Sequence, residues 1–237
     1  MQKITPCDAC EIRHLGICEV LNGAELQALG SISVRKRVPK GQAILSEGES
    51  GSVFANITSG AVKLSKSLGD GRQHIVGLLF APDFVGRPFR QDSPCLAEAA
   101  TDVGLCVFPR ARFERVLREH PALEHRLFER TLSGLDASRE WMLLLARKTA
   151  TEKVASFLLL LATRAPRRCC QLSGKAEVVR VELPLSRSEM ADCLGLTLET
   201  VSRQMTQLKT SGVIALLGYR EVGLPDMERL ANAAYAF

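Results

Sequence analysis

Residues 186–214, SRSEMADCLGLTLETVSRQMTQLKTSGVI, decide the fold of the C-terminal part of the chain. Ser186 is followed three residues later by Glu189, which is the pattern of a capping box at the start of a helix. Gly195 then permits a sharp turn, because a residue without a Cβ atom adopts positive φ at little cost. Thr197 is placed to cap a second helix. Two capped helices joined by a glycine turn predict a helix-turn-helix.

The second helix has one apolar and one polar face. Val201, Met205 and Leu208 recur at helical spacing and are expected to pack inward. The polar face suits a DNA major groove, where Arg donates two hydrogen bonds to guanine and Glu accepts one from cytosine. A surface ion pair between Glu199 and Arg203 on an ordinary helical hairpin is the alternative. The candidate DNA-contacting residues are Ser186, Arg187, Thr197, Glu199, Thr200, Ser202, Arg203, Gln207 and Lys209.

Residues 194–203, LGLTLETVSR, resemble the recognition helix of the CRP/FNR family of bacterial transcription regulators, including the Glu-x-x-Ser-Arg pattern of its FNR branch. The resemblance implies a homodimer that binds palindromic DNA of the form TTGAT-N4-ATCAA and controls anaerobic or microaerobic genes. It also implies an α+β fold, with an antiparallel β-roll, a long dimerisation helix and a winged helix-turn-helix. The expected segments are 1–30 (cysteine-rich), 31–121 (roll), 122–147 (dimerisation helix) and 148–237 (DNA-binding domain).

The composition is that of a globular protein with two domains. The 237 residues are 46% hydrophobic and 24% charged, and the net charge of +5 is compatible with phosphate contacts. The start, MQKITPCDAC, lacks the pattern of a signal peptide, and the apolar runs at 141–146 and 157–162 are too short to span a bilayer. We therefore expect a cytoplasmic protein with no membrane partner, in which thiols stay reduced.

Three cysteines lie close together near the N-terminus. Cys7, Cys10 and Cys18 occur in a polar, glycine-broken segment that cannot build a core of its own. Thiolates that converge on one point suit Zn²⁺ or an iron–sulfur cluster, and either group needs a fourth ligand. Three incidental thiols are the alternative interpretation.

The resemblance implies that the fourth ligand is Cys106, which lies in the Cys-x-x-Pro setting that FNR proteins use. From its apolar neighbours alone Cys106 would be a buried thiol, and Cys95 is the one substitute ligand. The implied cofactor is a [4Fe-4S] cluster that senses oxygen, held by Cys7, Cys10, Cys18 and Cys106. The N-terminal spacing looks like that of alphaproteobacterial members. The open alternatives are a haem, small-molecule or thiol sensor on the same fold, or a structural zinc site.

Short alternating segments separated by glycine-containing turns fill residues 33–107, which argues for an antiparallel barrel or jelly roll. Gly86 is followed by Arg87 rather than the Glu of cyclic-nucleotide-binding members, so no cyclic nucleotide is expected. In the FNR branch the equivalent loop touches RNA polymerase. The expected strands are Val34–Val38, Ala43–Leu45, Val53–Ile57, Ala61–Ser65, His74–Phe80 and Val103–Pro109.

Residues 122–146 are expected to form one long helix whose apolar stripe needs a partner. A second copy of the chain is the simplest partner, and the chain's own roll is the alternative. Asp136 and Glu140 interrupt the stripe, so like charges near a two-fold axis would oppose pairing until the cluster repositions the helix. The stripe comprises Leu123, Leu127, Phe128, Leu132, Leu135, Met142 and Leu145. The predicted dimer switch comprises Leu135, Asp136, Glu140 and Met142.

The remaining segments complete a winged helix, with a strand at Glu177–Leu183 and a hairpin after the helix-turn-helix. Residues 165–176 are expected to be a loop whose Cys169 and Cys170 are incidental, and Cys193 is expected to be a packed thiol. The four histidines show no spacing to a cysteine or carboxylate that suggests a nucleophile and its base, so an enzyme is not expected.

Overall fold

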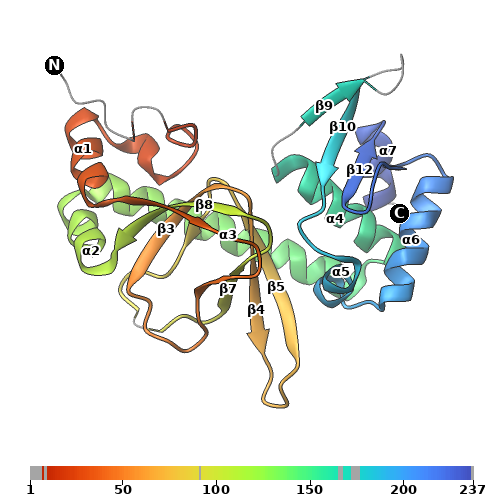
Figure 1. Ribbon diagram of the computed structural model, residues 1–237, viewed down its shortest axis with the longest axis horizontal. Coiled ribbons are helices and arrows are strands. Elements are labelled where there is room, and N and C mark those ends of the chain that lie inside the picture. Colours follow the sequence, from red (N-terminus) through yellow and green to blue (C-terminus); the bar gives the residue numbers. More distant parts are fainter. Residues whose placement is uncertain (1–6, 8–9, 91, 165–167, 172–176, 236–237) are drawn as a thin grey trace. The chain divides into compact units, whose positions relative to one another are not determined.

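The computed structural model describes residues 7, 10–90, 92–164, 168–171 and 177–235 (Figure 1). The chain divides into two compact units, one up to residue 137 and one from residue 138 onward. None of the described helices is long and apolar enough to cross a membrane.

The first unit is built on two antiparallel sheets of four strands each, with the orders β1-β8-β3-β6 and β2-β7-β4-β5. All six predicted strands are present. The structure adds two short strands, β6 and β7. The sequence gives little sign of either, because β6 has only two residues and β7 has the Ala-rich sequence LAEA, which has low strand propensity. The bounds are β1 Val34–Val38, β2 Ala43–Leu45, β3 Val53–Ser59, β4 Ala61–Ser67, β5 Gln73–Phe80, β6 Phe84–Val85, β7 Leu96–Ala99 and β8 Val103–Pro109.

The N-terminal segment packs on this roll through a core that also includes α1 (Gly23–Ile32) and α2 (Arg110–Glu119). Asn22 caps α1, because its side chain accepts from the Glu25 backbone N–H at 3.0 Å while the Glu25 carboxylate accepts from Asn22 N at 2.9 Å. The short 3₁₀ turn Ile17–Val20 precedes this cap. The buried members of the core are Ile17, Leu21, Leu26, Leu29, Phe54, Phe108, Phe113, Val116, Leu117 and Leu123.

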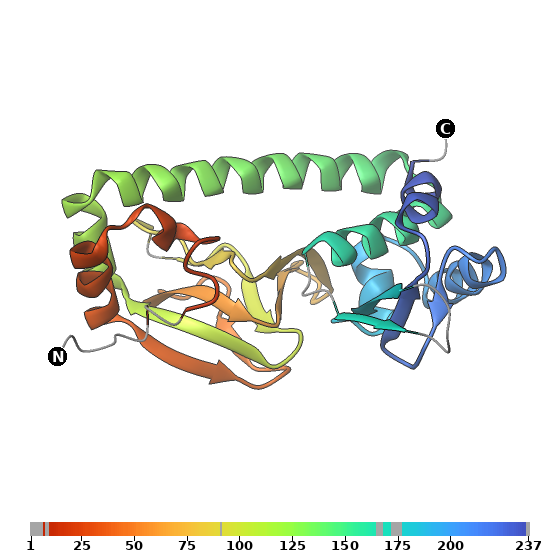
Figure 2. The same ribbon diagram turned by 90° about the horizontal axis from the view of Figure 1, so that it is seen from above.

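One unbroken helix, α3, spans Pro121–Arg147 (Figure 2). Pro121 fits its first position, where no backbone N–H is needed. The predicted apolar stripe divides into two parts, because Leu123 is buried and Leu127 packs against the first core, whereas four of the later members are exposed and Leu145 is half-buried. The exposed members recur at the 3–4 spacing of a coiled-coil seam. Their exposed fractions are Phe128 58%, Leu132 44%, Leu135 46% and Met142 60%.

The second unit is the predicted winged helix. Its sheet has the order β11-β12-β10-β9. The loop prediction for residues 165–176 is wrong at Arg168–Gln171, which forms β9 and pairs antiparallel with β10. The sequence of that stretch does not alternate between apolar and polar residues, and the strand forms by backbone pairing with β10. Residues 165–167 and 172–176 lie outside the described part of the chain. The bounds are α4 Ala150–Arg164, β9 Arg168–Gln171, β10 Glu177–Glu182, α5 Arg187–Leu194, α6 Leu198–Thr210, β11 Ala215–Leu216, β12 Glu221–Leu224 and α7 Met227–Ala234.

Candidate functional site

Four cysteines from two distant parts of the sequence line one cavity in the first unit. Its volume is about 20 Å³, which is room for one water molecule. Cys95, the alternative fourth ligand, is not among the described residues that line it. The wall consists of Cys7, Cys10, Ile12, Arg13, Gly16, Cys18, Leu26, Leu29, Asn56, Cys106 and Phe108.

Tight backbone turns hold the three N-terminal thiols near one another. The N–H of Cys10 donates to the carbonyl of Cys7 at 3.3 Å, and the N–H of Arg13 donates to the carbonyl of Cys10 at 3.1 Å. Helix α1 allows the sulfur of Cys7 to approach closely at Gly30, where a Cβ atom would lie 3.1 Å from Cys7 Sγ. A larger residue at position 30 would therefore crowd this thiol.

Cys106 enters the cavity wall from the middle of β8. It lies opposite Arg35 of β1 and Asn56 of β3 in the antiparallel register. A strand that is paired on both sides leaves little freedom for the position of this thiol. The cavity thus combines one rigidly held cysteine with three on a turn-rich segment.

Burial controls the protonation of the two most enclosed thiols. The pKa of Cys18 is raised to about 12, mainly by burial and to a smaller extent by the nearby Cys106, Cys7 and Cys10. Burial likewise raises the pKa of Cys106 to about 11, with Cys7 and Cys10 adding to the effect. These two thiols are therefore protonated near neutral pH, and a bound metal must displace their protons.

The donor set has the composition of a four-cysteine cluster site, because the described wall contains four thiols and neither carboxylate nor imidazole. Within the described residues, no three Cys, His, Asp or Glu side chains form a group that could hold a metal ion as they stand. A tetrahedral zinc ion would require sulfurs about 3.8 Å apart, since each Zn–S bond is about 2.3 Å. A cluster tolerates wider separations, because each cysteine binds a different iron.

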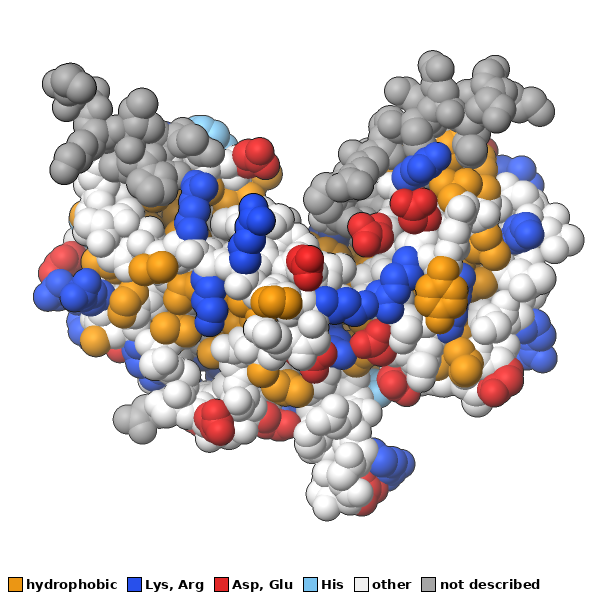
Figure 3. Space-filling model, viewed as in Figure 1, with side chains coloured by type: hydrophobic (Ala, Val, Ile, Leu, Met, Phe, Trp, Pro, Cys, Tyr) orange, Lys and Arg blue, Asp and Glu red, His pale blue; other side chains and the backbone are white. Residues whose placement is uncertain are grey.

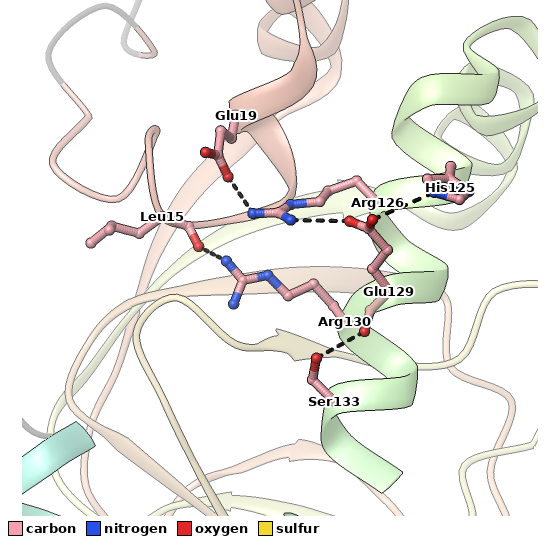
Figure 4. A network of polar contacts seen from close by, with 7 residues as sticks. All are labelled: Leu15, Glu19, His125, Arg126, Glu129, Arg130 and Ser133. Atoms are coloured by element: carbon pink, nitrogen blue, oxygen red, sulfur yellow. Dashed lines mark hydrogen bonds and ion pairs between the residues drawn. The ribbon is translucent and has the colours of Figure 1, made fainter. Parts of the chain in front are cut away.

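Two arginines of α3 connect this helix to the cysteine-bearing segment (Figure 4). Arg130 Nη2 donates to the backbone carbonyl of Leu15, and Arg126 Nη2 donates to the carboxylate of Glu19. Arg126 also donates to Glu129 at 3.0 Å, which raises the pKa of Arg126 and lowers that of Glu129. Leu15 and Glu19 flank Cys18, so the segment that carries the thiols is bonded directly to the helix.

The helix-turn-helix has the predicted caps. Ser186 Oγ accepts from the N–H of Glu189 at 3.2 Å, and Thr197 Oγ1 accepts from the N–H of Thr200 at 3.2 Å. Gly195 adopts φ 61° at the turn between α5 and α6. The Ser186 and Thr197 hydroxyls therefore serve first as helix caps. Arg187 is half-buried, and burial lowers its pKa.

Most of the other candidate DNA-contacting side chains lie on the exposed face of α6. Thr200 is half-buried. Among the described contacts no ion pair joins Glu199 to Arg203, and hydrogen bonds from its own backbone N–H and from Thr197 lower the pKa of the Glu199 carboxyl. On the face of the protein drawn in Figure 3, Lys and Arg side chains lie among Asp and Glu side chains. The exposed candidates are Glu199, Ser202, Arg203, Gln207 and Lys209.

The sequence gives no sign that Gln204, a polar residue, is buried and joins α6 to α4. Gln204 is only 7% exposed although it lies in a polar run, and its Oε1 accepts from Thr151 Oγ1 of α4 at 2.6 Å. The apolar face behaves as predicted, with Val201, Met205 and Leu208 buried. Cys193 is buried, as predicted, and burial raises its pKa to about 12.

Comparison with known proteins agrees with this architecture. Residues 152–233 match the Crp-like helix-turn-helix domain, and residues 35–120 match the cyclic nucleotide-binding domain. A "Probable transcriptional activator" of Rhizobium leguminosarum bv. viciae is 48% identical over 224 residues, covering 94% of this chain and 91% of that protein. The transcriptional activator protein FnrL of Cereibacter sphaeroides is 44% identical over 228 residues, covering 96% and 91%.

The solved structure of FixK2 from Bradyrhizobium japonicum has a TM-score of 0.75 at 32% identity, and the match covers 87% of this chain and 99% of that one. Both domains, their order and nearly the whole chain are therefore shared with regulators of transcription. The chain belongs to the CRP/FNR family of transcription regulators, and it is a DNA-binding regulator rather than an enzyme.

Proposed function

We propose that this regulator senses oxygen through a [4Fe-4S] cluster held by Cys7, Cys10, Cys18 and Cys106. The observation that carries the proposal is the single cavity lined by these four thiols, three from the N-terminal turns and one from β8. A bound cluster supplies the oxygen-reactive chemistry. The chain supplies four sulfur ligands and an otherwise largely apolar wall that limits the access of water.

The small cavity gives a physical reason for coupling to the rest of the chain. A volume of about 20 Å³ does not hold a four-iron cluster, so uptake requires the N-terminal turns to move relative to β8. That movement reaches α3 through the bonds from Arg126 to Glu19 and from Arg130 to Leu15. The two arginines lie on the same turns of α3 as Phe128 and Leu132 but on a different face, because residues two apart on a helix do not face each other.

The exposed stripe of α3 is proposed to pair with a second copy of the chain. Its spacing fits a coiled-coil seam, and pairing removes large apolar side chains from water. Asp136 and Glu140 are exposed beside the stripe, and their like charges oppose pairing. In the proposal, the cluster-bound arrangement of the N-terminal segment positions α3 so that the apolar contact outweighs this repulsion.

The dimer is proposed to activate or repress transcription at palindromic sites of the FNR type. A two-fold dimer presents two copies of α6 to two half-sites, with Glu199, Ser202 and Arg203 reading base edges. RNA polymerase is the proposed partner of the loop after Gly86. The roll is proposed to bind no cyclic nucleotide, since Arg87 replaces the acidic ligand and the loop is held by the bond from Phe89 N to Glu114 at 3.0 Å.

Substitution of the fourth thiol tests the ligand set. Anaerobically purified wild-type protein should contain about four irons and four sulfides per chain, and Cys106→Ser should lose most of both because a three-thiol site holds the cluster poorly. Cys95→Ser is the control and should retain them. Iron, sulfide and visible absorption are measured. Equal cluster content in Cys106→Ser, or loss in Cys95→Ser, would contradict the ligand assignment, and zinc without colour would indicate a structural metal site.

Removal of the two arginine bonds tests the route to α3. The double variant Arg126→Gln/Arg130→Gln should keep wild-type iron content yet dimerise about tenfold more weakly. The reason is that movement of the cysteine-bearing segment would no longer be transmitted to the exposed apolar stripe of α3. Arg115→Gln is the control, since Arg115 is an exposed α2 residue whose ion pair with Glu119 is 3.9 Å long. Anaerobic analytical ultracentrifugation measures association. Unchanged dimerisation with a full cluster, or loss of the cluster itself, argues against this route.

The DNA-reading role of α6 is tested by comparing two substitutions. Arg203→Ala should weaken binding to a TTGAT-N4-ATCAA duplex by about 1–3 kcal/mol per half-site while leaving binding to a scrambled duplex nearly unchanged. Lys209→Ala should weaken both to a similar extent and reduce the salt dependence, as expected of a phosphate contact. Fluorescence anisotropy of the anaerobic dimer measures both. If Arg203→Ala behaves like Lys209→Ala, Arg203 does not read a base.

A further inference from the structure

Asn56 lies in the wall of the cysteine cavity although its surroundings are otherwise poor in polar groups. The side chain comes from the centre of β3 and is 1% exposed. Its Nδ2 donates to the sulfur of Cys18 at 3.8 Å, and the residue lies opposite Cys106 in the antiparallel register. Asn56 thus contacts one proposed cluster ligand and is the cross-strand neighbour of another.

The other polar atom of this amide lacks a partner. Asn56 Oδ1 is fully buried, and no hydrogen bond to it is found within the described residues. A buried amide with an unsatisfied acceptor costs about 1–3 kcal/mol relative to a satisfied one, and an apolar residue of similar shape avoids that cost. Gln204, a buried amide in the second unit, has its Oε1 satisfied by Thr151. Asn56 is therefore poorly explained by the stability of the fold alone.

We propose that Asn56 is a positioning residue for the iron–sulfur cluster, donating an N–H···S hydrogen bond to the Cys18 thiolate and protecting the cluster against loss in oxygen. The inference rests on the proposed function and adds a residue to it. A thiolate accepts hydrogen bonds and cannot donate one, so a ligated Cys18 fixes the amide with Nδ2 towards the sulfur.

The chemical effect follows from the charge on sulfur. An N–H donor withdraws electron density from a ligating thiolate, and hydrogen bonds to the sulfurs are among the factors that set cluster potentials. Groups that hydrogen-bond to metal ligands also orient those ligands, and their removal typically costs about 10–100-fold in metal affinity or activity. Loss of the Asn56 amide is therefore expected to lower the reduction potential of the cluster and to speed its oxidation.

The test compares Asn56→Leu with Gln204→Leu in the whole chain. Both variants remove a buried amide, but the oxygen of Asn56 has no hydrogen bond among the described residues, whereas that of Gln204 accepts one from Thr151. In the apo form, Asn56→Leu should unfold at the same or higher urea concentration than wild type, while Gln204→Leu should unfold at lower concentration. After anaerobic reconstitution with iron and sulfide, Asn56→Leu should lose its cluster in air about tenfold faster, shift the Fe–S stretching bands in the resonance Raman spectrum and have a lower midpoint potential. Gln204→Leu should match wild type in all three.

Two results would overturn the inference in distinguishable ways. If Asn56→Leu destabilises the apo chain as Gln204→Leu does, and the reconstituted variant matches wild type in Raman bands, potential and air lifetime, Asn56 is a structural residue only. If the wild-type chain takes up no iron and sulfide, the oxygen-sensing function itself fails and the role of Asn56 fails with it.

Discussion

Packing of the N-terminal segment on the roll brings Cys7, Cys10 and Cys18 into one cavity wall with Cys106. Ile17 and Leu21 bury their side chains beside Phe54, Phe108 and the helices α1 and α2. The backbone hydrogen bonds described for the turns before them join residues only three or four positions apart, so this apolar contact is what holds the turns against the roll. Without that burial Cys106, which lies far along the chain from the other three cysteines, would share no cavity with them, and the proposed cluster site would not form.

The same arrangement explains how a local event at sulfur can have a distant effect. One side of the cavity is a strand paired on both edges, and the other is a segment of turns bonded to α3 by Arg126 and Arg130. If a group binds between the cysteines, the turns are therefore expected to move more than β8 does. In the proposed mechanism, α3 would carry that movement towards its later apolar side chains, which are exposed. The contact network thus links the cysteine cavity to the helix proposed for dimerisation.

The sequence predicts the helix caps and turns well, but it does not predict the hydrogen bonds between residues far apart in the chain. The caps at Ser186 and Thr197 and the glycine turn depend on residues a few positions apart, so the pattern contains the information. Cys106 entered the ligand set through family resemblance, since its apolar neighbours alone indicate a packed thiol. The bonds from Arg126 to Glu19 and from Thr151 to Gln204 join residues 107 and 53 positions apart and have no local signal. Asn56 was overlooked because it appears only as a polar interruption in a strand.

In the proposed function, the state of the cluster and the dimerisation of the chain form one coupled equilibrium. The most direct measurement admits oxygen stepwise to the anaerobic, cluster-loaded protein and follows visible absorption and molar mass by light scattering in the same sample. We expect a coloured dimer that becomes a colourless monomer, with absorption and mass falling together, and both recovering on anaerobic reconstitution. A mass that stays constant while the colour is lost, or a chain that is colourless from the start, would contradict it.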